Sequence, residues 1–427
     1  MNTRFYNARI LTIESFDIAS GEVWVEADKI THVGAGKLSE VKWDRQIDCK
    51  NNLLMPAFKN GHAHSPMTFL RSLADDMPLK DWLFKRVFPI EAKLTGDDVY
   101  WGSVLAVMEY LTSGISAAFD MYFFQRDVIQ AFMDTGFRGV FCSAVNSLTA
   151  DDLQAETLRI EKEYVEWNRL SPLISYQLGF HAEYTTSRPM LEALCGLIKK
   201  HKAPAYTHLS EGRGEREDCV ARNGMSPTEY LDMLGFYDYG GGAFHAIHLE
   251  DYEIDILKKR NVGVITNSAC NAKIASGIAP VVKYLERGIT VGLGTDGPAS
   301  NNSLDFFKEM FMTAVLQKID GWDASKLDAL EVLKMATTGS AKIMRLFNCD
   351  TLEKGKSADI ILIDMAEPNM QPENNIPKNL VYAGSKKNVL LTMVNGKILY
   401  ENGEFNIGFE RGKVYEQVNK TVKRIVN

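Results

Sequence analysis

Two hydrophobic periods alternate along the middle of the chain. Short apolar runs typical of buried strands are followed by segments whose apolar residues recur every three to four positions, as in helices. Helical segments include residues 98–114, which end at Gly114, and residues 188–201. Eight strands alternating with helices predict an α/β fold, a parallel (β/α)₈ barrel of the TIM type. The strand candidates are LLMPAF (53–58), SAAFDMYF (116–123), RGVFCSAV (138–145), LISYQLGF (173–180), PAYTHLS (204–210), AFHAIHL (243–249), VGVITNS (262–268) and ITVGLGTD (289–296).

Both ends of the chain are rich in strands instead. Short strand patterns cover 4–13, 22–30 and 31–38 near the start, and 358–365 and 389–400 near the end, before a helix at 412–427. The simplest arrangement is one small β-sandwich built from both termini. The expected division is 1–55 for the first part of the sandwich, 56–350 for the barrel, and 351–427 for the rest of the sandwich with the C-terminal helix.

Composition narrows the class of protein. The 427 residues carry a net charge of −7, and no basic cluster stands out, which argues against nucleic acid as a partner. No apolar run reaches the ~18 residues that a membrane helix needs, and the first residues contain no apolar core of a signal peptide. The six cysteines form no CxxC pair, which suits free thiols in a reducing cytoplasm.

Histidines gather at the ends of the predicted strands. Six of the eight lie there, and an aspartate ends the eighth strand. Barrels of this kind build their sites at the carboxyl ends of the strands, so these side chains are expected to meet. Imidazoles with a carboxylate suit one divalent cation, Zn²⁺ or alternatively Fe²⁺. The residues are His62, His64, His181, His208, His245, His248 and Asp296.

Local spacing adds detail to this site. His62 and His64 lie two apart, so in an extended segment both face one side. Glu211 follows His208 by three residues, where a carboxylate can transfer protons, although a solvated glutamate at a helix start is the plain alternative. Asp296 has a plain alternative too, as a helix N-cap. Spacing does not choose between His245 and His248.

These motifs resemble the amidohydrolase superfamily, in its mononuclear deaminase branch. Most similar is the group of S-adenosylhomocysteine, 5′-methylthioadenosine, adenosine and 5′-deoxyadenosine deaminases. The resemblance covers nearly the whole chain. It is carried by MPAFKNGHAHSPMTFLRSLADDMPLKDWLFKRVFPIEAKLT, GFHAEYT, THLSE, HAIHLED, SACNAKIASGIAPV, GLGTDGPASNNSLDFFKEM and GKSADIILID.

The resemblance implies a role for each residue. It implies hydrolytic deamination of an adenosine-type nucleoside, a small-molecule substrate, with a water molecule adding to C6. By analogy it also implies a homo-oligomer. The implied metal ligands are His62, His64, His208 and Asp296; Glu211, His245 and Asp296 would transfer protons, Glu91 would hold the ribose hydroxyls, and Glu211 and His181 would contact the substrate.

The sequence departs from the family pattern at two places. An arginine expected near the end of the third strand is replaced, with Ser143 near that position, and a second arginine has no clear counterpart in 149–159. Such arginines suit the carboxylate of homocysteine, so their absence disfavours adenosylhomocysteine. The usual NPxSN motif reads NSACN at 267–271.

Two other functions compete with this prediction. One is a deaminase or chlorohydrolase of another heterocycle, such as guanine, a pterin or a triazine, for which Glu91 would have no ribose to bind. The other is a non-catalytic structural homologue, which the presence of all the ligands and proton-transfer residues argues against.

Overall fold

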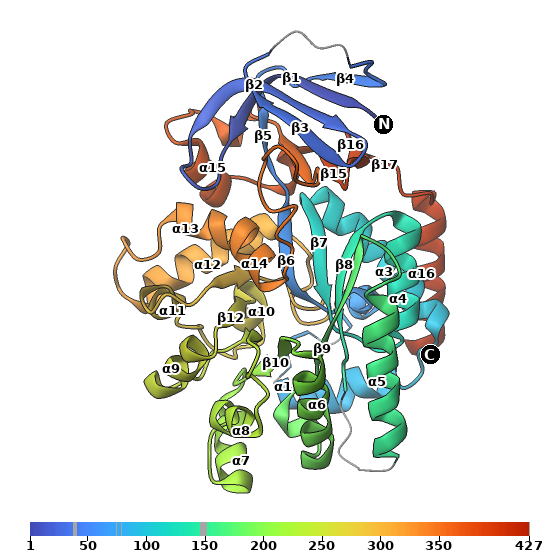
Figure 1. Ribbon diagram of the computed structural model, residues 1–427, viewed down its shortest axis with the longest axis vertical. Helices are drawn as coiled ribbons and strands as arrows, with labels where there is room; N and C mark the ends of the chain where they lie inside the picture. Colours follow the sequence, from blue (N-terminus) through green and yellow to red (C-terminus); the bar gives the residue numbers. More distant parts are fainter. Residues whose placement is uncertain (37–40, 74, 78, 146–151, 427) are drawn as a thin grey trace.

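The computed structural model describes residues 1–36, 41–73, 75–77, 79–145 and 152–426. Its centre is a sheet of eight parallel strands in the order β13-β12-β11-β10-β9-β8-β7-β6 (Figure 1). The Asn60 side chain joins the two edges, donating to Thr295 Oγ1 at 2.7 Å and accepting from the Thr295 amide at 2.9 Å. The predicted barrel is confirmed. Its strands are β6 (Phe58–Ala63), β7 (Ile115–Asp120), β8 (Arg138–Cys142), β9 (Ile174–Gly179), β10 (Ala205–Leu209), β11 (Gly241–His245), β12 (Val262–Thr266) and β13 (Val291–Leu293).

Helices follow the barrel strands, as the 3.6-residue period predicts. Helix α3 begins with a capping box in which Thr95 and Asp98 bond each other's backbone amides, and Gly114 follows its end at φ +74°. The helices are α3 (Gly96–Thr112), α4 (Gln125–Thr135), α5 (Leu153–Trp167), α6 (Arg188–His201), α7 (Arg213–Asn223), α8 (Pro227–Leu234), α9 (Asp251–Lys259), α10 (Ser268–Lys273), α11 (Val281–Glu286) and α12 (Phe306–Asp320).

Short helical segments fill the longer connections. Between β6 and α3 lie η1 (Ser65–Leu70), α1 (Leu79–Trp82), η2 (Leu83–Val87) and α2 (Phe88–Glu91), and η3 (Glu183–Thr185) follows β9. After α12 come α13 (Ala329–Lys334), η4 (Met335–Gly339) and α14 (Ser340–Ile343).

A second, mixed sheet is assembled from both ends of the chain, as predicted (Figure 1, top). β14 pairs antiparallel with β5, which joins the C-terminal strands to the N-terminal ones. Alternate residues of this sheet form a core of their own, whereas their neighbours pack into the barrel core. Its strands are β1 (Thr3–Leu11), β2 (Ile18–Glu26), β3 (Lys29–Gly34), β4 (Arg45–Asp48), β5 (Leu53–Pro56), β14 (Ile360–Ile363), β15 (Val389–Val394), β16 (Lys397–Glu401) and β17 (Glu404–Phe405).

The first barrel strand was predicted wrongly. The apolar run 53–58 is split: β5 belongs to the terminal sheet, and the barrel strand is β6. The polar residues of β6 hid it, although every residue of this strand is buried. Lys59 is paired with Asp359 and Asn60 with Thr295, so their polar groups are satisfied inside the fold.

The C-terminal helix α16 (Arg411–Val426) runs beside α3, as Figure 1 shows. The predicted helix is thus confirmed, with Asn427 outside the described residues. Residues 37 and 38 of the predicted strand 31–38 and residues 149–151 also lie outside them.

Between β14 and β15 lie η5 (Pro368–Met370), α15 (Ile376–Tyr382) and η6 (Lys386–Asn388). Among the described residues, no helix is both long and apolar enough to cross a membrane. The domain limits stay a prediction.

Candidate active site

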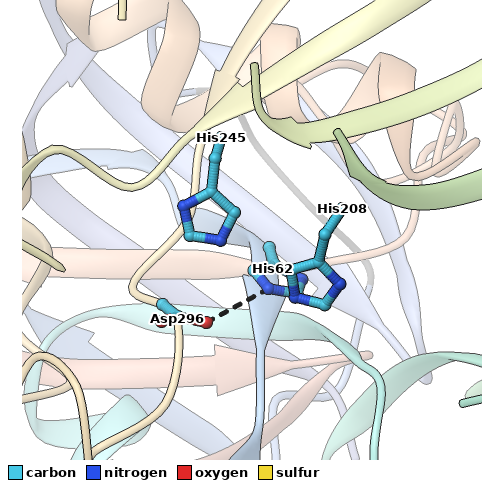
Figure 2. Close-up of side chains that lie close together, drawn as sticks. All are labelled: His62, His208, His245 and Asp296. Atoms are coloured by element: carbon cyan, nitrogen blue, oxygen red, sulfur yellow. Dashed lines mark ion pairs between the residues drawn. The ribbon is translucent and has the colours of Figure 1, made fainter. Parts of the chain in front are cut away.

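Four side chains from four barrel strands converge on one point, as Figure 2 shows. His62 lies in β6, His208 in β10, His245 ends β11, and Asp296 follows β13. One ligand atom from each lies within 4.8 Å of the others, and all four residues are buried. The carboxyl ends of the strands bring them together, as the positions of the histidines predicted.

His64 is a fifth member of this cluster. Its Nε2 lies 3.1 Å from Asp296 Oδ1 and 3.4 Å from His208 Nε2. The predicted ligands His62, His64, His208 and Asp296 therefore all meet. The four atoms that lie within 4.8 Å of one another, however, include His245 in place of His64.

The donor set fits a divalent cation. His62 Nε2 and Asp296 Oδ1 lie 3.2 Å apart, yet among the described residues neither atom has a hydrogen-bond partner. Orphaned polar atoms are costly in a buried site, and a cation would satisfy them. The Nδ1 atoms of His64 and His208 contact the carbonyls of Met121 and His181, at 2.5 and 2.7 Å. Carbonyls can only accept, so both Nε2 atoms are left free to bind a metal.

Burial and mutual contacts set the charges here. Burial lowers the pKa of His62 to about 3 and that of His208 well below its usual range, so both rings are neutral. Burial opposes ionisation of Asp296, but contacts with His62 and His64 hold its pKa well below normal. Burial alone would lower the pKa of His64, but contact with Asp296 raises it to about 9. A bound cation would displace that proton.

Glu211 stands beside the cluster, two residues after β10. Its Oε1 lies 3.8 Å from His245 Nδ1. Burial raises the pKa of its carboxyl above the usual range. That shift increases the protonated fraction, which a proton donor needs.

The remaining predicted site residues line the same pocket. Glu91 accepts a hydrogen bond from the Tyr122 hydroxyl at 2.6 Å. His181 bonds Thr185 Oγ1 through Nδ1 at 3.0 Å, and burial lowers its pKa to about 4. The pocket also has apolar walls; its lining includes His64, Trp82, Leu83, Phe88, Glu91, Tyr122, His181, Glu211, His245 and Asp296. His248 is not part of this lining and contacts the carbonyl of Ser276 instead.

Sequence reasoning missed several partners of these groups. Tyr122 is the last residue but one of the predicted strand 116–123, but nothing in the sequence pairs it with Glu91, 31 residues away. Ser300 donates to Asp296 Oδ2 at 2.5 Å; it lies in the segment GLGTDGPASNNSLDFFKEM, but its spacing from Asp296 assigned it no role. Ser143, which stands near a missing arginine, is fully buried and donates to the Gly179 carbonyl, so its side chain does not serve the pocket.

Comparison with known proteins finds deaminases among both the relatives and the solved structures. The chain is 38% identical to a 5-methylthioadenosine/S-adenosylhomocysteine deaminase of Caldanaerobacter subterraneus, over 100% of this chain and 99% of that protein. It is 36% identical to a 5′-deoxyadenosine deaminase of Methanopyrus kandleri, over 85% and 84% of the two chains. A crystal structure of an adenosine deaminase from Xanthomonas campestris with bound zinc superimposes with a TM-score of 0.92, at 29% identity over 99% and 98% of the chains. Because the model of the amidohydrolase family matches residues 53–399, the chain belongs to that family.

Proposed function

We propose that the protein catalyses metal-dependent hydrolytic deamination of an adenosine-type nucleoside to the inosine analogue and ammonia. One observation carries this proposal. A histidine–aspartate cluster, the half-buried Glu211 beside it and a second carboxylate, Glu91, all face one pocket. The names of the relatives, a 5-methylthioadenosine/S-adenosylhomocysteine deaminase and a 5′-deoxyadenosine deaminase, support the same substrate class.

The metal would be held by His62, His64, His208 and Asp296, with His245 close enough to join or replace one of them. When bound, a divalent cation such as Zn²⁺ lowers the pKa of a coordinated water to about 7 and so supplies a nucleophile at neutral pH. The zinc named with the Xanthomonas deaminase structure supports Zn²⁺, with Fe²⁺ as the alternative.

The protein's own groups would move the protons. Asp296 and His245 accept the proton of the attacking water. Glu211 gives a proton to ring N1 and helps to carry one to the departing amine, for which its raised pKa is suited. Glu91 accepts hydrogen bonds from the ribose hydroxyls, and His181, neutral at pH 7, contacts the substrate. Holding the nucleoside in this way lowers the barrier by fixing its orientation.

The 5′ group of the preferred substrate is expected to be small or neutral. The side chain of Ser143 is turned away from the pocket, toward the Gly179 carbonyl, so no cation stands at that position to meet a carboxylate. We therefore propose adenosine, 5′-deoxyadenosine and 5′-methylthioadenosine ahead of S-adenosylhomocysteine.

Ammonia release with the zinc-loaded enzyme tests the substrate class. The panel is adenosine, 5′-deoxyadenosine, 5′-methylthioadenosine, S-adenosylhomocysteine, guanine and cytosine. Turnover of the first three is expected, with little of the fourth. Glu91→Gln should raise KM for the nucleosides by about tenfold or more, because a charged acceptor is lost. Release from guanine alone, or an unchanged KM in Glu91→Gln, would contradict the proposal.

Metal removal tests whether the proposed reaction depends on a metal. Chelation should abolish ammonia release, and added Zn²⁺ or Fe²⁺ should restore it. Full activity of protein with less than about 0.1 metal per chain would contradict metal dependence.

The cytoplasmic location also stays a proposal, supported by six cysteines that are all free thiols. The homo-oligomer stays a prediction.

A further inference from the structure

The motif NSACN, which departs from the family pattern, forms the start of α10 at the carboxyl end of β12. Asn267 precedes the helix, and residues 268–271 are all buried. Two successive side chains of this short helix reach the two groups that would take the proton of the attacking water.

The first of these is Cys270. It is fully buried, and its thiol lies 2.9 Å from Asp296 Oδ2, as a donor. Ser300 donates to the same oxygen. The other oxygen, Oδ1, faces His62 and His64. The carboxylate is thus fixed with one oxygen toward the cluster and the other toward two donors.

The second is Asn271, which is 1% exposed. Its Oδ1 lies 2.7 Å from His245 Nδ1. An amide oxygen can only accept, so Nδ1 of His245 must carry the proton. The unprotonated Nε2 is then the nitrogen left to accept a proton.

We propose that Cys270 and Asn271 are positioning residues, which orient the Asp296 carboxylate and select the Nδ1–H tautomer of His245. This inference rests on the proposed function, because it assigns these two groups to proton transfer. It also explains the altered motif: cysteine keeps a donor toward Asp296 where the family pattern has another residue, although a thiol donates more weakly than a hydroxyl.

Kinetics of matched variants test the proposal. Asn271→Leu should lower kcat by about 30-fold or more with KM within about threefold, because a misplaced proton acceptor affects the chemical step. Cys270→Ala should lower kcat about tenfold, and Cys270→Ser should restore it. The control is Ser268→Ala. Ser268 lies on the same helix as Cys270 and Asn271 and accepts a buried hydrogen bond from Thr313 of α12, so the substitution removes a bond without touching either group. Thermal midpoints should match among the variants. If Asn271→Leu and Cys270→Ala stay as active as the control, the proposal is wrong.

A measurement independent of turnover separates this inference from the proposed function. In ¹⁵N-histidine-labelled protein, with and without zinc, the two ring nitrogens of His245 can be assigned by NMR. The wild type should show a protonated Nδ1, and Asn271→Leu should show a mixture of tautomers. An unprotonated Nδ1 in the wild type, which a flipped Asn271 amide would produce, overturns the proposal. A wild type that deaminates no nucleoside but shows the expected tautomer would contradict only the proposed function.

Discussion

A buried carboxylate, Glu215, holds the turn that carries Glu211. Its Oε1 accepts from the amide of Ser210 and its Oε2 from the amide of Glu211, both at 2.8 Å. Ser210 has a left-handed backbone, at φ +47°, which costs energy unless its surroundings hold it. Two amides on one carboxylate therefore fix both the strained turn and the direction in which Glu211 leaves it.

Glu215→Gln should lower kcat by about tenfold or more, because an amide NH₂ cannot accept the second bond. The matched control is Glu183→Gln. Glu183 is another buried carboxylate that bonds α7, through Arg222 and Asn223, but it does not touch the Glu211 turn. Steady-state kinetics and metal content are the measurements. Equal losses in the two variants would mean that Glu215 acts only by holding α7.

The pH dependence of stability gives an independent test of Glu215. Burial raises its pKa to about 8, although two backbone amides oppose the shift. An acid whose pKa is raised on folding stabilises the fold below its unfolded pKa, near 4.5, and this stabilisation is lost as the pH rises through about 8. The free energy of unfolding should therefore fall less between pH 5 and 8 in Glu215→Gln than in the wild type. If urea denaturation shows that the free energy of unfolding falls equally in Glu215→Gln and in the wild type across that range, this assignment is wrong.

Tyr122 should matter through Glu91 alone. Its hydroxyl is the partner of the Glu91 carboxylate, so Tyr122→Phe leaves that carboxylate less well oriented toward the ribose. KM for nucleosides should rise about fivefold to tenfold, with a smaller change in kcat. Tyr110→Phe is the control, because Tyr110 is buried and bonds Ser65 Oγ at 2.8 Å but does not line the pocket. A larger effect in the control would contradict the pairing.

At the level of elements, the start of α3 also anchors the last helix of the chain. Asp98 accepts from the Thr95 amide and hydroxyl, at 2.8 and 2.6 Å, and from Thr421 at 2.8 Å. Arg424 of α16 bonds the same carboxylate. One side chain therefore caps α3 and joins it to a helix more than three hundred residues away in the sequence.

Asp98→Asn should destabilise the protein by about 2–3 kcal/mol, through loss of the cap and of the charged hydrogen bonds. Asp97→Asn, an exposed neighbour in the same turn, should change stability by less than about 0.5 kcal/mol. The bonds from Thr95, Arg424 and Thr421 lower the pKa of Asp98 despite its burial. The stabilisation of the fold by Asp98 is therefore present above pH ~4 and is lost at lower pH. There the free energies of unfolding of Asp98→Asn and Asp97→Asn should become equal. Urea midpoints at pH 7 and below pH 4 measure both effects.

Whether the sequence pattern could locate an element depended on where its residues find their partners. Apolar runs located most barrel strands, but β6 was missed because Lys59 and Asn60 find partners that no local pattern contains. The site histidines were located by their place at strand ends. Spacing could not choose between His245 and His248, because His245 and Ala246 have φ of +65° and +47° and interrupt the alternation of an extended strand. Pairings across the barrel, such as Cys270 with Asp296, depend on the closed fold.

At the level of the whole molecule, a buried charge cluster joins the terminal sheet to the barrel. Asp359, just before β14, bonds Arg138 of β8 at 3.1 Å and lies 3.4 Å from Lys59 Nζ of β6. The side chains of Asp359 and Lys59 are fully buried. Burial opposes its ionisation, but the charges of Arg138 and Lys59 hold the pKa of Asp359 at about 2. The carboxylate is therefore ionised wherever the protein is folded near neutral pH.

Removing this carboxylate alone should destabilise the protein far more than replacing all three charged residues. Asp359→Asn leaves two buried cations without a counter-charge and should cost about 3–5 kcal/mol. Asp350→Asn, which breaks a half-buried pair with Lys356, should cost about 1 kcal/mol or less. Replacing the three charges together, as Lys59→Met, Arg138→Met and Asp359→Leu, should recover at least half of the loss, because no unpaired ion remains. Urea unfolding at pH 7 decides the matter: a triple variant less stable than Asp359→Asn would show that hydrogen bonds to Ser116, Ser357 and Asn395, rather than charge balance, join the two units.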